Sequence, residues 1–193
     1  FMSETIDNMF SLEGPDGSGK STQAKLIKEA LEGNIMRVEL LKSPDTTLLG
    51  EFIRANVGNL EPWLRDKLFL LDIEASLKKV EGKKDHIIVW DRYIDSFYAS
   101  NKEMSIEAAE VLTARLPKPK KTFFLDISSQ HIFSERRETL DHHSIPEWLQ
   151  QKSERYYEIL RREPERVMRI DARRPILEIT QQIVVEIKKI LGR

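Results

Sequence analysis

Nine consecutive residues near the start of the chain have the types and the spacing of a phosphate-binding loop. They are Gly14, Pro15, Asp16, Gly17, Ser18, Gly19, Lys20, Ser21 and Thr22, and the first eight fit the pattern G-x-x-x-x-G-K-[ST]. Glycines let successive backbone N–H groups approach and surround a phosphate. The lysine is suited to contact the β- and γ-phosphates of a nucleotide, and the serine hydroxyl is suited to ligate Mg²⁺. The alternative is a glycine-rich turn that matches by chance.

The residues that flank this loop favour the functional interpretation. An apolar run, Met9–Leu12, precedes the loop, and a helical pattern that begins at Lys20 follows it. A strand, loop and helix in this order direct the loop amides and the helix N-terminus at one point, which makes an anion site. The sequence therefore predicts that the chain binds a nucleoside triphosphate.

A second pair of charged residues directly follows another apolar run. Asp91 and Arg92 come after His86–Trp90. In a parallel α/β sheet they would lie at the carboxyl edge, where the phosphate loop also lies. A carboxylate at that edge can support Mg²⁺, and a guanidinium can bind a second phosphate through two hydrogen bonds. A surface Asp–Arg pair that caps a helix is the alternative.

Strand-like and helix-like segments alternate along the chain, and this alternation indicates how these residues are positioned. Apolar runs typical of strands occur at Met9–Leu12, Ile35–Leu41, His86–Trp90, Thr122–Ile127 and Val167–Ile170. Helical patterns occur at Lys20–Glu32, Leu48–Asn56, Glu61–Val80, Ile94–Leu116, Gln130–Arg137, Ile145–Arg162 and Ile176–Leu191. Together they predict an α/β domain over residues 2–193 with a central parallel five-stranded sheet covered by helices on both faces. With the phosphate loop, this is the P-loop NTPase fold.

The composition excludes several classes of function. A formal net charge of −1 argues against bulk nucleic-acid binding, which needs a basic field. The chain has no cysteine, so it has no disulfide, zinc–thiolate site or thiol nucleophile. No apolar stretch approaches the length of a membrane span. We therefore expect no nucleic-acid or membrane partner and a cytoplasmic location.

The motifs, taken in order, resemble those of the thymidylate kinases. The opening Phe10-x-x-Glu13-Gly14-x-Asp16-Gly17-x-Gly19-Lys20-Ser21-Thr22-Gln23 and the segment Asp91-Arg92-Tyr93-x-x-Ser96 are similar to two specific motifs of that family. Weaker similarities follow at Pro117–Asp126, Glu135–Arg137, Tyr156 and Arg166–Ala172, in the family's order. The resemblance implies transfer of the γ-phosphoryl group of Mg²⁺-bound ATP to a deoxynucleoside 5′-monophosphate, with dTMP giving dTDP as the first choice. Members of that family are commonly homodimers that pack through helices. The predicted helices over residues 68–77 and 94–111 have apolar faces that would allow such a contact.

The resemblance also assigns catalytic roles. Asp16 would contact the sugar 3′-hydroxyl of the acceptor, while Lys20, Asp91 and Arg92 would bind phosphates and metal. Some family members carry an arginine at the position of Gly17, and others supply one from a mobile lid. This chain has glycine there, so we expect the lid, at about 134–146, to provide Arg136 or Arg137.

Acceptor recognition is where the sequence departs from the family. The acceptor-binding set that the resemblance implies is Asp16, Lys42, Arg54, Phe69, Arg92, Ser96 and Asn101. The family's L-F-x-x-D-R, whose arginine donates to thymine, ends here in Ile73, and the tyrosine of its S-x-x-A-Y-Q is replaced by Ser100. Other pyrimidine or deoxynucleoside monophosphates, a nucleoside acceptor, or a nucleotide-binding module without turnover therefore remain open alternatives.

Overall fold

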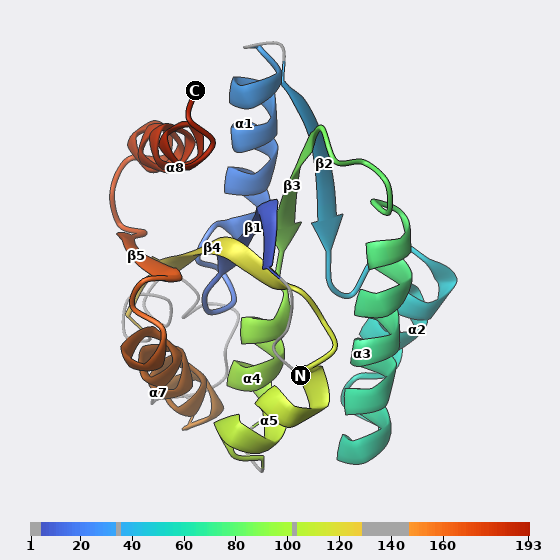
Figure 1. The fold of residues 1–193 in the computed structure, drawn as a ribbon. Helices are drawn as coiled ribbons and strands as arrows, with labels where there is room; N and C mark the ends of the chain where they lie inside the picture. Colours follow the sequence, from blue (N-terminus) through green and yellow to red (C-terminus); the bar gives the residue numbers. More distant parts are fainter. Residues whose placement is uncertain (1–4, 34–35, 102–103, 129–146) are drawn as a thin grey trace.

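The strands of the computed structural model form the parallel sheet that the sequence predicts. The structure describes residues 5–33, 36–101, 104–128 and 147–193. The strands are β1 (Thr5–Glu13), β2 (Arg37–Lys42), β3 (His86–Asp91), β4 (Lys118–Asp126) and β5 (Val167–Asp171). They pair in the order β2-β3-β1-β4-β5, and every pairing is parallel (Figure 1). The five-stranded parallel sheet is therefore confirmed.

Helices cover both faces of this sheet. The helices are α1 (Lys20–Glu32), α2 (Leu48–Asn56), α3 (Pro62–Lys78), α4 (Ile94–Ser100), α5 (Ile106–Thr113), α7 (Glu147–Arg162) and α8 (Ile176–Ile190). Helices α1 and α8 lie on one side of the sheet, and α4, α5 and α7 lie on the other (Figure 1). Apolar strands that are covered on both faces read as continuous hydrophobic runs, which is why the strand segments were recognisable.

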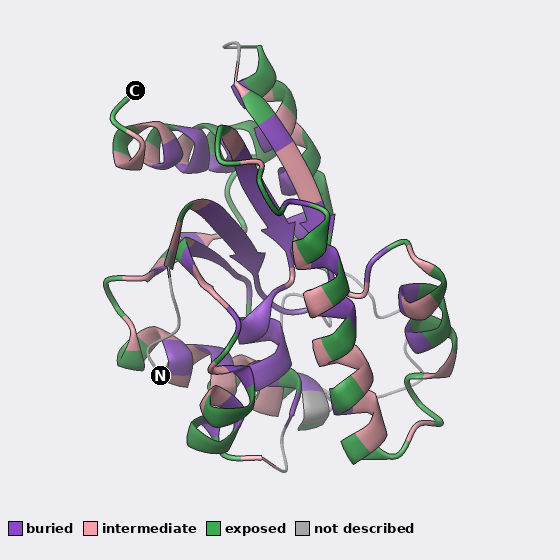
Figure 2. Ribbon diagram, turned by 45° about the vertical axis from the view of Figure 1, so that its right-hand side comes forward, coloured by how far each residue is buried: buried purple, intermediate pink, exposed green. Residues whose placement is uncertain are grey.

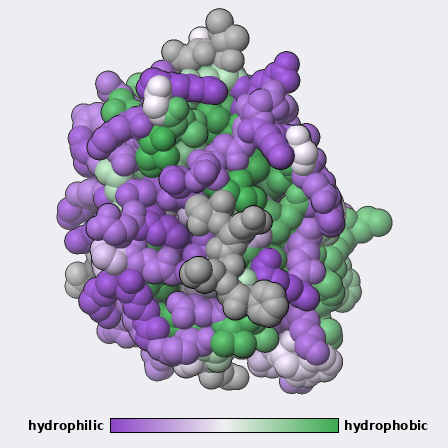
Figure 3. All heavy atoms as spheres, in the orientation of Figure 1, coloured by the Kyte–Doolittle hydropathy of each residue, from purple (hydrophilic) through white to green (hydrophobic). Residues whose placement is uncertain are grey.

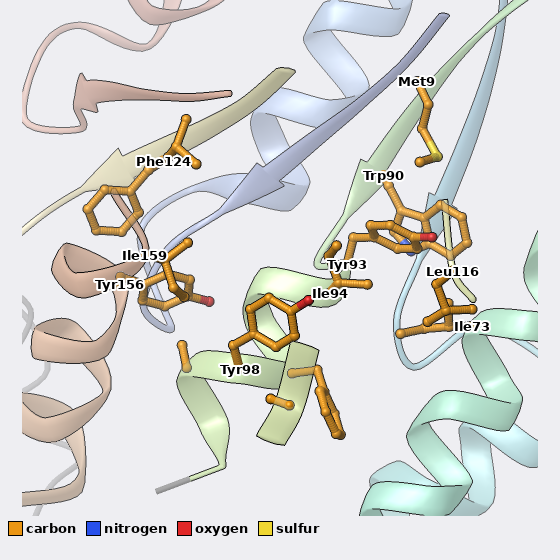
Figure 4. Close-up of a cluster of buried hydrophobic side chains, with 14 of the residues drawn as sticks. Met9, Ile73, Trp90, Tyr93, Ile94, Tyr98, Leu116, Phe124, Tyr156 and Ile159 are labelled. Carbon is orange, nitrogen blue, oxygen red and sulfur yellow. The ribbon is translucent and has the colours of Figure 1, made fainter. Parts of the chain in front are cut away.

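Two hydrophobic clusters fill the spaces between the sheet and its helices. One packs α1 and α8 on the sheet through residues such as Ile27 and Ile183, which are fully buried. The other packs α3, α4, α5 and α7 on the opposite face (Figure 4). There the rings of Trp90 and Tyr93 lie 4.4 Å apart between centroids. Figure 2 shows that the strands are largely buried and that exposed residues lie on the outer sides of the helices.

The sequence was wrong about one long helix, Ile94–Leu116. The structure divides it into α4 and α5. Helix α4 ends at Ser100, and the backbone of its C-cap Asn101 leaves the helical region with φ −103° and ψ 72°. Helix α5 then begins anew at the N-cap Ser105, whose side chain accepts a hydrogen bond from the N–H of Ala108. The predicted helix Gln130–Arg137 and the lid at about 134–146 lie outside the described residues.

None of the helices in the described part of the chain is long and apolar enough to cross a bilayer. Hydrophilic residues dominate the face drawn in Figure 3, and hydrophobic residues show between them.

Strand register sets the position of the functional edge. Leu12 of β1 and Lys42 of β2 both pair with Asp91 of β3, so these three strands end at the same level. The phosphate loop and the turn after β3 therefore start from neighbouring strands, as the rule for parallel α/β sheets requires.

Candidate nucleotide-binding site

The loop between β1 and α1 has the backbone that a phosphate-binding loop needs. Gly14, Gly17 and Gly19 have φ values of 144°, 89° and 86°, which side-chain-bearing residues rarely adopt. A Cβ on Gly14 would lie 2.6 Å from the carbonyl oxygen of Leu125, so β4 also restricts this position to glycine. The glycine spacing recognised in the sequence is therefore a structural requirement of this loop.

Lys20 lies inside the loop rather than pointing into solvent. Its Nζ donates to the carbonyl oxygens of Gly14 and Pro15, at 2.9 and 2.6 Å, and to Ser18 Oγ at 3.1 Å. The side chain is 4% exposed. This burial, with the charge of Arg92 adding to it, lowers the pKa of Lys20 to about 7. An anion inside the loop would offset this effect by favouring the charged ammonium.

Ser21 and Asp91 form the pair that the sequence predicted for a metal. The hydroxyl of Ser21, in the first turn of α1, donates to Asp91 Oδ2 at the end of β3 at 2.5 Å. Asp91 Oδ1 is buried and has no hydrogen-bond partner among the described residues. A hydroxyl and a carboxylate are hard oxygen ligands that suit Mg²⁺. The part of the chain that the structure describes holds no cluster of three or more His, Cys, Asp or Glu side chains that could bind a metal ion.

Asp16, Arg92 and Lys152 form a cluster of charges beside the loop. The carboxylate of Asp16 pairs with Arg92 Nη2 through Oδ1 and lies 3.4 Å from Lys152 Nζ through Oδ2. Burial would raise the pKa of Asp16, but the charges of Lys152, Arg92 and Lys20 outweigh it and hold that pKa below its ordinary value. Two cations thus surround one carboxylate, which leaves a net positive charge for an anion.

The backbone of Arg92 is held in an uncommon conformation. Its φ is 68°, the only positive value outside glycine among the described residues. The Arg92 N–H donates to the carbonyl oxygen of Leu12 at 3.1 Å, and the following Tyr93 N–H donates to Glu13 Oε1 at 2.7 Å. Strain of this kind persists where surrounding contacts fix it, and it gathers at functional sites.

Glu13 is the anchor of this turn. It is fully buried at the end of β1, where it accepts hydrogen bonds from the Tyr93 N–H, the Ser96 hydroxyl and, at 3.4 Å, the Tyr156 hydroxyl. Burial and the nearby Asp95 raise the pKa of Glu13 to about 7, against the opposing effect of these hydrogen bonds and of Arg92. Glu13 thus ties the phosphate-loop strand to the turn that carries Arg92.

A cavity of about 320 Å³ opens beside these charges. Its residues include Asp16, Ser43, Pro44, Ile53, Arg54, Val57, Arg65, Asp66, Phe69, Ile73, Arg92, Tyr93, Ser96, Phe97, Ser100, Asn101 and Lys152. Asp16, Arg92 and Lys152 give it a charged part next to the phosphate loop, while residues of α3 and α4 such as Phe69, Ile73 and Phe97 give it apolar walls. A cavity with such a composition suits a ligand that has a phosphate and a flat apolar ring.

The structure brings most of the predicted acceptor residues into this cavity. Arg54, Phe69, Ser96 and Asn101 join Asp16 and Arg92 in its lining. Arg54 donates to the carbonyl oxygens of Pro44 and Asp45, at 2.8 and 2.7 Å, so it also braces the loop after β2. The Ser96 hydroxyl bonds to Glu13 and Tyr156, so it supports the turn after β3.

The structure does not place Lys42, Arg136 or Arg137 in the cavity. Lys42 is exposed at the end of β2 and is not among the residues that line the cavity. The reason is the strand's alternation, which turns Leu41 into the core and Lys42 away from it. Arg136 and Arg137 lie outside the described residues.

Sequence reasoning missed Lys152, Asp66 and the role of Glu13. Lys152 lies on α7, 136 positions from its partner Asp16, and no motif marks it. Asp66 lies within a helical segment where a charged residue is ordinary. The role of Glu13 could have been recognised from the sequence, because a carboxylate at the end of a buried strand needs a hydrogen-bonding or charged partner.

Comparison with known proteins agrees with this geometry. A family described as "Thymidylate kinase" matches residues 12–183. A thymidylate kinase of Kosmotoga olearia is 29% identical, with 91% of this chain and 93% of that protein covered. One from Roseiflexus castenholzii is 28% identical over 94% and 93% of the two chains, and one from another Roseiflexus strain is 30% identical over 90% of each. The matched region contains the phosphate loop, the turn after β3 and the cavity, and the chain belongs to the thymidylate kinase family.

Proposed function

We propose that this protein transfers the γ-phosphoryl group of Mg²⁺-bound ATP to dTMP and so forms dTDP. The observation that carries the proposal is the cavity whose charged part adjoins the phosphate loop and whose remaining walls are apolar and aromatic. Such an arrangement would hold an acceptor phosphate beside the donor phosphates. The similar proteins of Kosmotoga and Roseiflexus bear the name thymidylate kinase, which supports the choice of acceptor.

The donor would bind through the loop between β1 and α1. Its backbone N–H groups and Lys20 would contact the phosphates, and Lys20 would exchange loop oxygens for phosphate oxygens. Ser21 and Asp91 would hold Mg²⁺, which when bound neutralises charge on the β- and γ-phosphate oxygens. The pairing of these two side chains and the unsatisfied Asp91 Oδ1 support that assignment.

The acceptor would bind in the cavity with its phosphate at Arg92 and Lys152. Asp16 would accept a hydrogen bond from the sugar 3′-hydroxyl, and Phe69 would pack on the base. An oxygen of the acceptor phosphate would then attack the γ-phosphorus, forming a new O–P bond while the bond to the β-phosphate oxygen breaks and ADP leaves. Positioning and electrostatic stabilisation supply most of the catalysis in this kind of transfer.

A coupled assay of ADP release tests the proposed function. The full chain would be assayed with Mg²⁺-bound ATP against dTMP, dUMP, dCMP, dGMP, AMP and thymidine. We expect dTMP to give the highest kcat/KM and formation of dTDP to match ADP release. Preference for thymidine would show a nucleoside kinase, and ADP release without any phosphorylated acceptor would contradict the proposal.

The pKa of Lys20 leads to a prediction about ATP binding. Above pH 7 the amine is mostly neutral in the free protein, and bound phosphates favour its protonated form, so binding takes up a proton. Affinity for ATP should therefore fall as the pH rises above 7, by at most about tenfold per unit from this group. Calorimetry at pH 8 in two buffers of different ionisation enthalpy measures the uptake. Lys20→Met is the control, and equal proton uptake by both proteins would refute the assignment.

Arg92→Ala should weaken acceptor binding far more than donor binding. The lost guanidinium contact with the acceptor phosphate predicts a rise of about 10- to 100-fold in KM for dTMP, from a charge-assisted interaction of about 1.5–3 kcal/mol. Steady-state kinetics with each substrate varied in turn measure the division. Arg92→Lys, which keeps the charge but loses the fork, should lie between the two proteins. An equal change in KM for ATP would reject this division of roles.

A homodimer in the cytoplasm is also part of the proposal. Phe52 of α2 and Trp63 and Leu71 of α3 are large apolar residues that are 47–61% exposed, which favours a helix-mediated contact. The face of 94–111 contributes less than its sequence suggested, because Ile94 and Phe97 belong to the core.

A further inference from the structure

We infer that Asp66 is a positioning residue that sets the orientation of the Asn101 side-chain amide and thereby makes the cavity select thymine or uracil over cytosine. The inference rests on the proposed function, because it concerns the base of the same acceptor. It adds a residue that the sequence motifs do not mark.

The observation is a buried hydrogen bond between two helices at the cavity wall. Asp66, in the second turn of α3, and Asn101, the C-cap of α4, are 9% and 4% exposed. Asn101 Nδ2 donates to Asp66 Oδ2 at 2.5 Å. Both residues line the cavity together with the apolar side chains of Phe69, Ile73 and Phe97.

The chemistry of Asp66 determines which way the amide faces. An ionised carboxylate accepts hydrogen bonds and donates none, so only the NH₂ group of Asn101 can face it. The other carboxylate oxygen, Oδ1, accepts from Arg65 Nε and Nη2 at 3.3 and 3.2 Å. Both oxygens of Asp66 therefore act as acceptors, and a flipped amide would place two oxygens against each other.

A fixed amide distinguishes pyrimidines by their hydrogen-bonding edge. With one N–H of Nδ2 bound to Asp66, the amide can offer its oxygen and its second N–H side by side. Thymine and uracil present an N3–H donor beside the O4 acceptor, which matches that pair. Cytosine presents the reverse, an N3 acceptor beside an N4 amino donor, and would match only the flipped amide that Asp66 forbids.

The first test uses the unmodified protein and needs no variant. The acceptors dUMP and dCMP both lack the 5-methyl group and differ only at this edge of the base. We expect kcat/KM for dUMP to exceed that for dCMP by about tenfold or more, the discrimination typical of a two-bond base contact. We also expect N3-methyl-dUMP, which has no N3–H, to be as poor as dCMP. Equal use of dUMP and dCMP, or a preference for dCMP, overturns the inference.

The second test is Asp66→Asn. An asparagine here can accept from or donate to Asn101, so both orientations of the amide become available. The ratio of kcat/KM for dUMP over dCMP should then fall by about tenfold. Asp72→Asn is the matched control, because Asp72 is a buried carboxylate of the same helix that does not line the cavity. Its Oδ2 accepts a hydrogen bond from the Asp45 N–H at 3.0 Å.

The outcomes separate this inference from the proposed function. An unchanged ratio in a folded Asp66→Asn protein overturns the positioning role while leaving kinase activity intact. A fall of the same size in Asp72→Asn also overturns it, since the effect would then come from α3 in general. Failure of the unmodified protein to phosphorylate any monophosphate contradicts the proposed function instead. Should Asp66→Asn not fold, Asn101→Ala replaces it: loss of the amide should lower the ratio of kcat/KM for dUMP over dCMP by about tenfold, and an unchanged ratio overturns the inference.

Discussion

Lys20→Ala is expected to abolish phosphoryl transfer in a protein that still folds. Lys20 is buried, but its contacts are three hydrogen bonds to the oxygens of its own loop, not packing against the hydrophobic clusters. Its ammonium would neutralise charge that develops on the transferred group. Removal of one preorganised electrostatic contact typically costs about 10²–10³-fold in kcat, and the loss here should be at least that large because a full charge is lost.

The measurement is kcat for dTDP formation at saturating substrates, with thermal unfolding measured on the same samples. Lys20→Met separates charge from volume, because methionine keeps most of the apolar stem without the ammonium. Both variants should be inactive and fold cooperatively. Substantial transfer by either folded variant would mean that the phosphates bind elsewhere.

Replacement of both Arg136 and Arg137 with alanine should give the second large loss, in kcat. Gly17 offers no side chain, and the described arginines Arg54, Arg65 and Arg92 line the cavity that we propose for the acceptor. The transfer still needs a cation on the developing charge, and the resemblance to the family predicts that these two residues belong to a lid. A contact that forms mainly in the transition state lowers kcat more than it raises KM. The loss could reach about 10³-fold, the lower range for arginine fingers.

Both single variants and the double variant would be assayed at saturating ATP and dTMP. Arg161→Ala with Arg162→Ala is the matched control, because this adjacent pair is exposed at the end of α7. Near-normal kcat in the Arg136/Arg137 double variant would refute the lid assignment. Arg155 is then a poor substitute, since its guanidinium donates to the carbonyl oxygens of Tyr98 and Met104 at 2.8 and 2.9 Å.

The parts of the site that the sequence predicted are those that one short segment determines. The phosphate loop needs glycines, a lysine and a serine at fixed spacing, so its function can be predicted from one short run of consecutive residues. Asp91 and Arg92 were placed because the end of a buried parallel strand lies at a known edge of the sheet. The five strands were recognisable for the same local reason, since each contains an apolar run.

The parts that the sequence did not predict depend on contacts between distant segments. The ion pair of Lys152 with Asp16 and the hydrogen bond of Asp66 with Asn101 join positions 136 and 35 residues apart. Nothing in a helical pattern tells which polar residue faces a cavity. The break between α4 and α5 was missed although the sequence carries a signal for it, because Ser105, the N-cap of α5, stands between the apolar residues of the two helices.

The left-handed backbone at Arg92 sets stability and function against each other at one residue. A side chain in that region costs roughly 1–2 kcal/mol relative to the right-handed helix, a cost that glycine avoids. Selection for folding alone would therefore favour glycine here. The proposed contact with the acceptor phosphate would account for an arginine here, and the ion pair of its side chain with Asp16 offsets part of the conformational cost. If the acceptor contact were not needed, glycine at this position would remove the conformational cost and would lose the ion pair with Asp16.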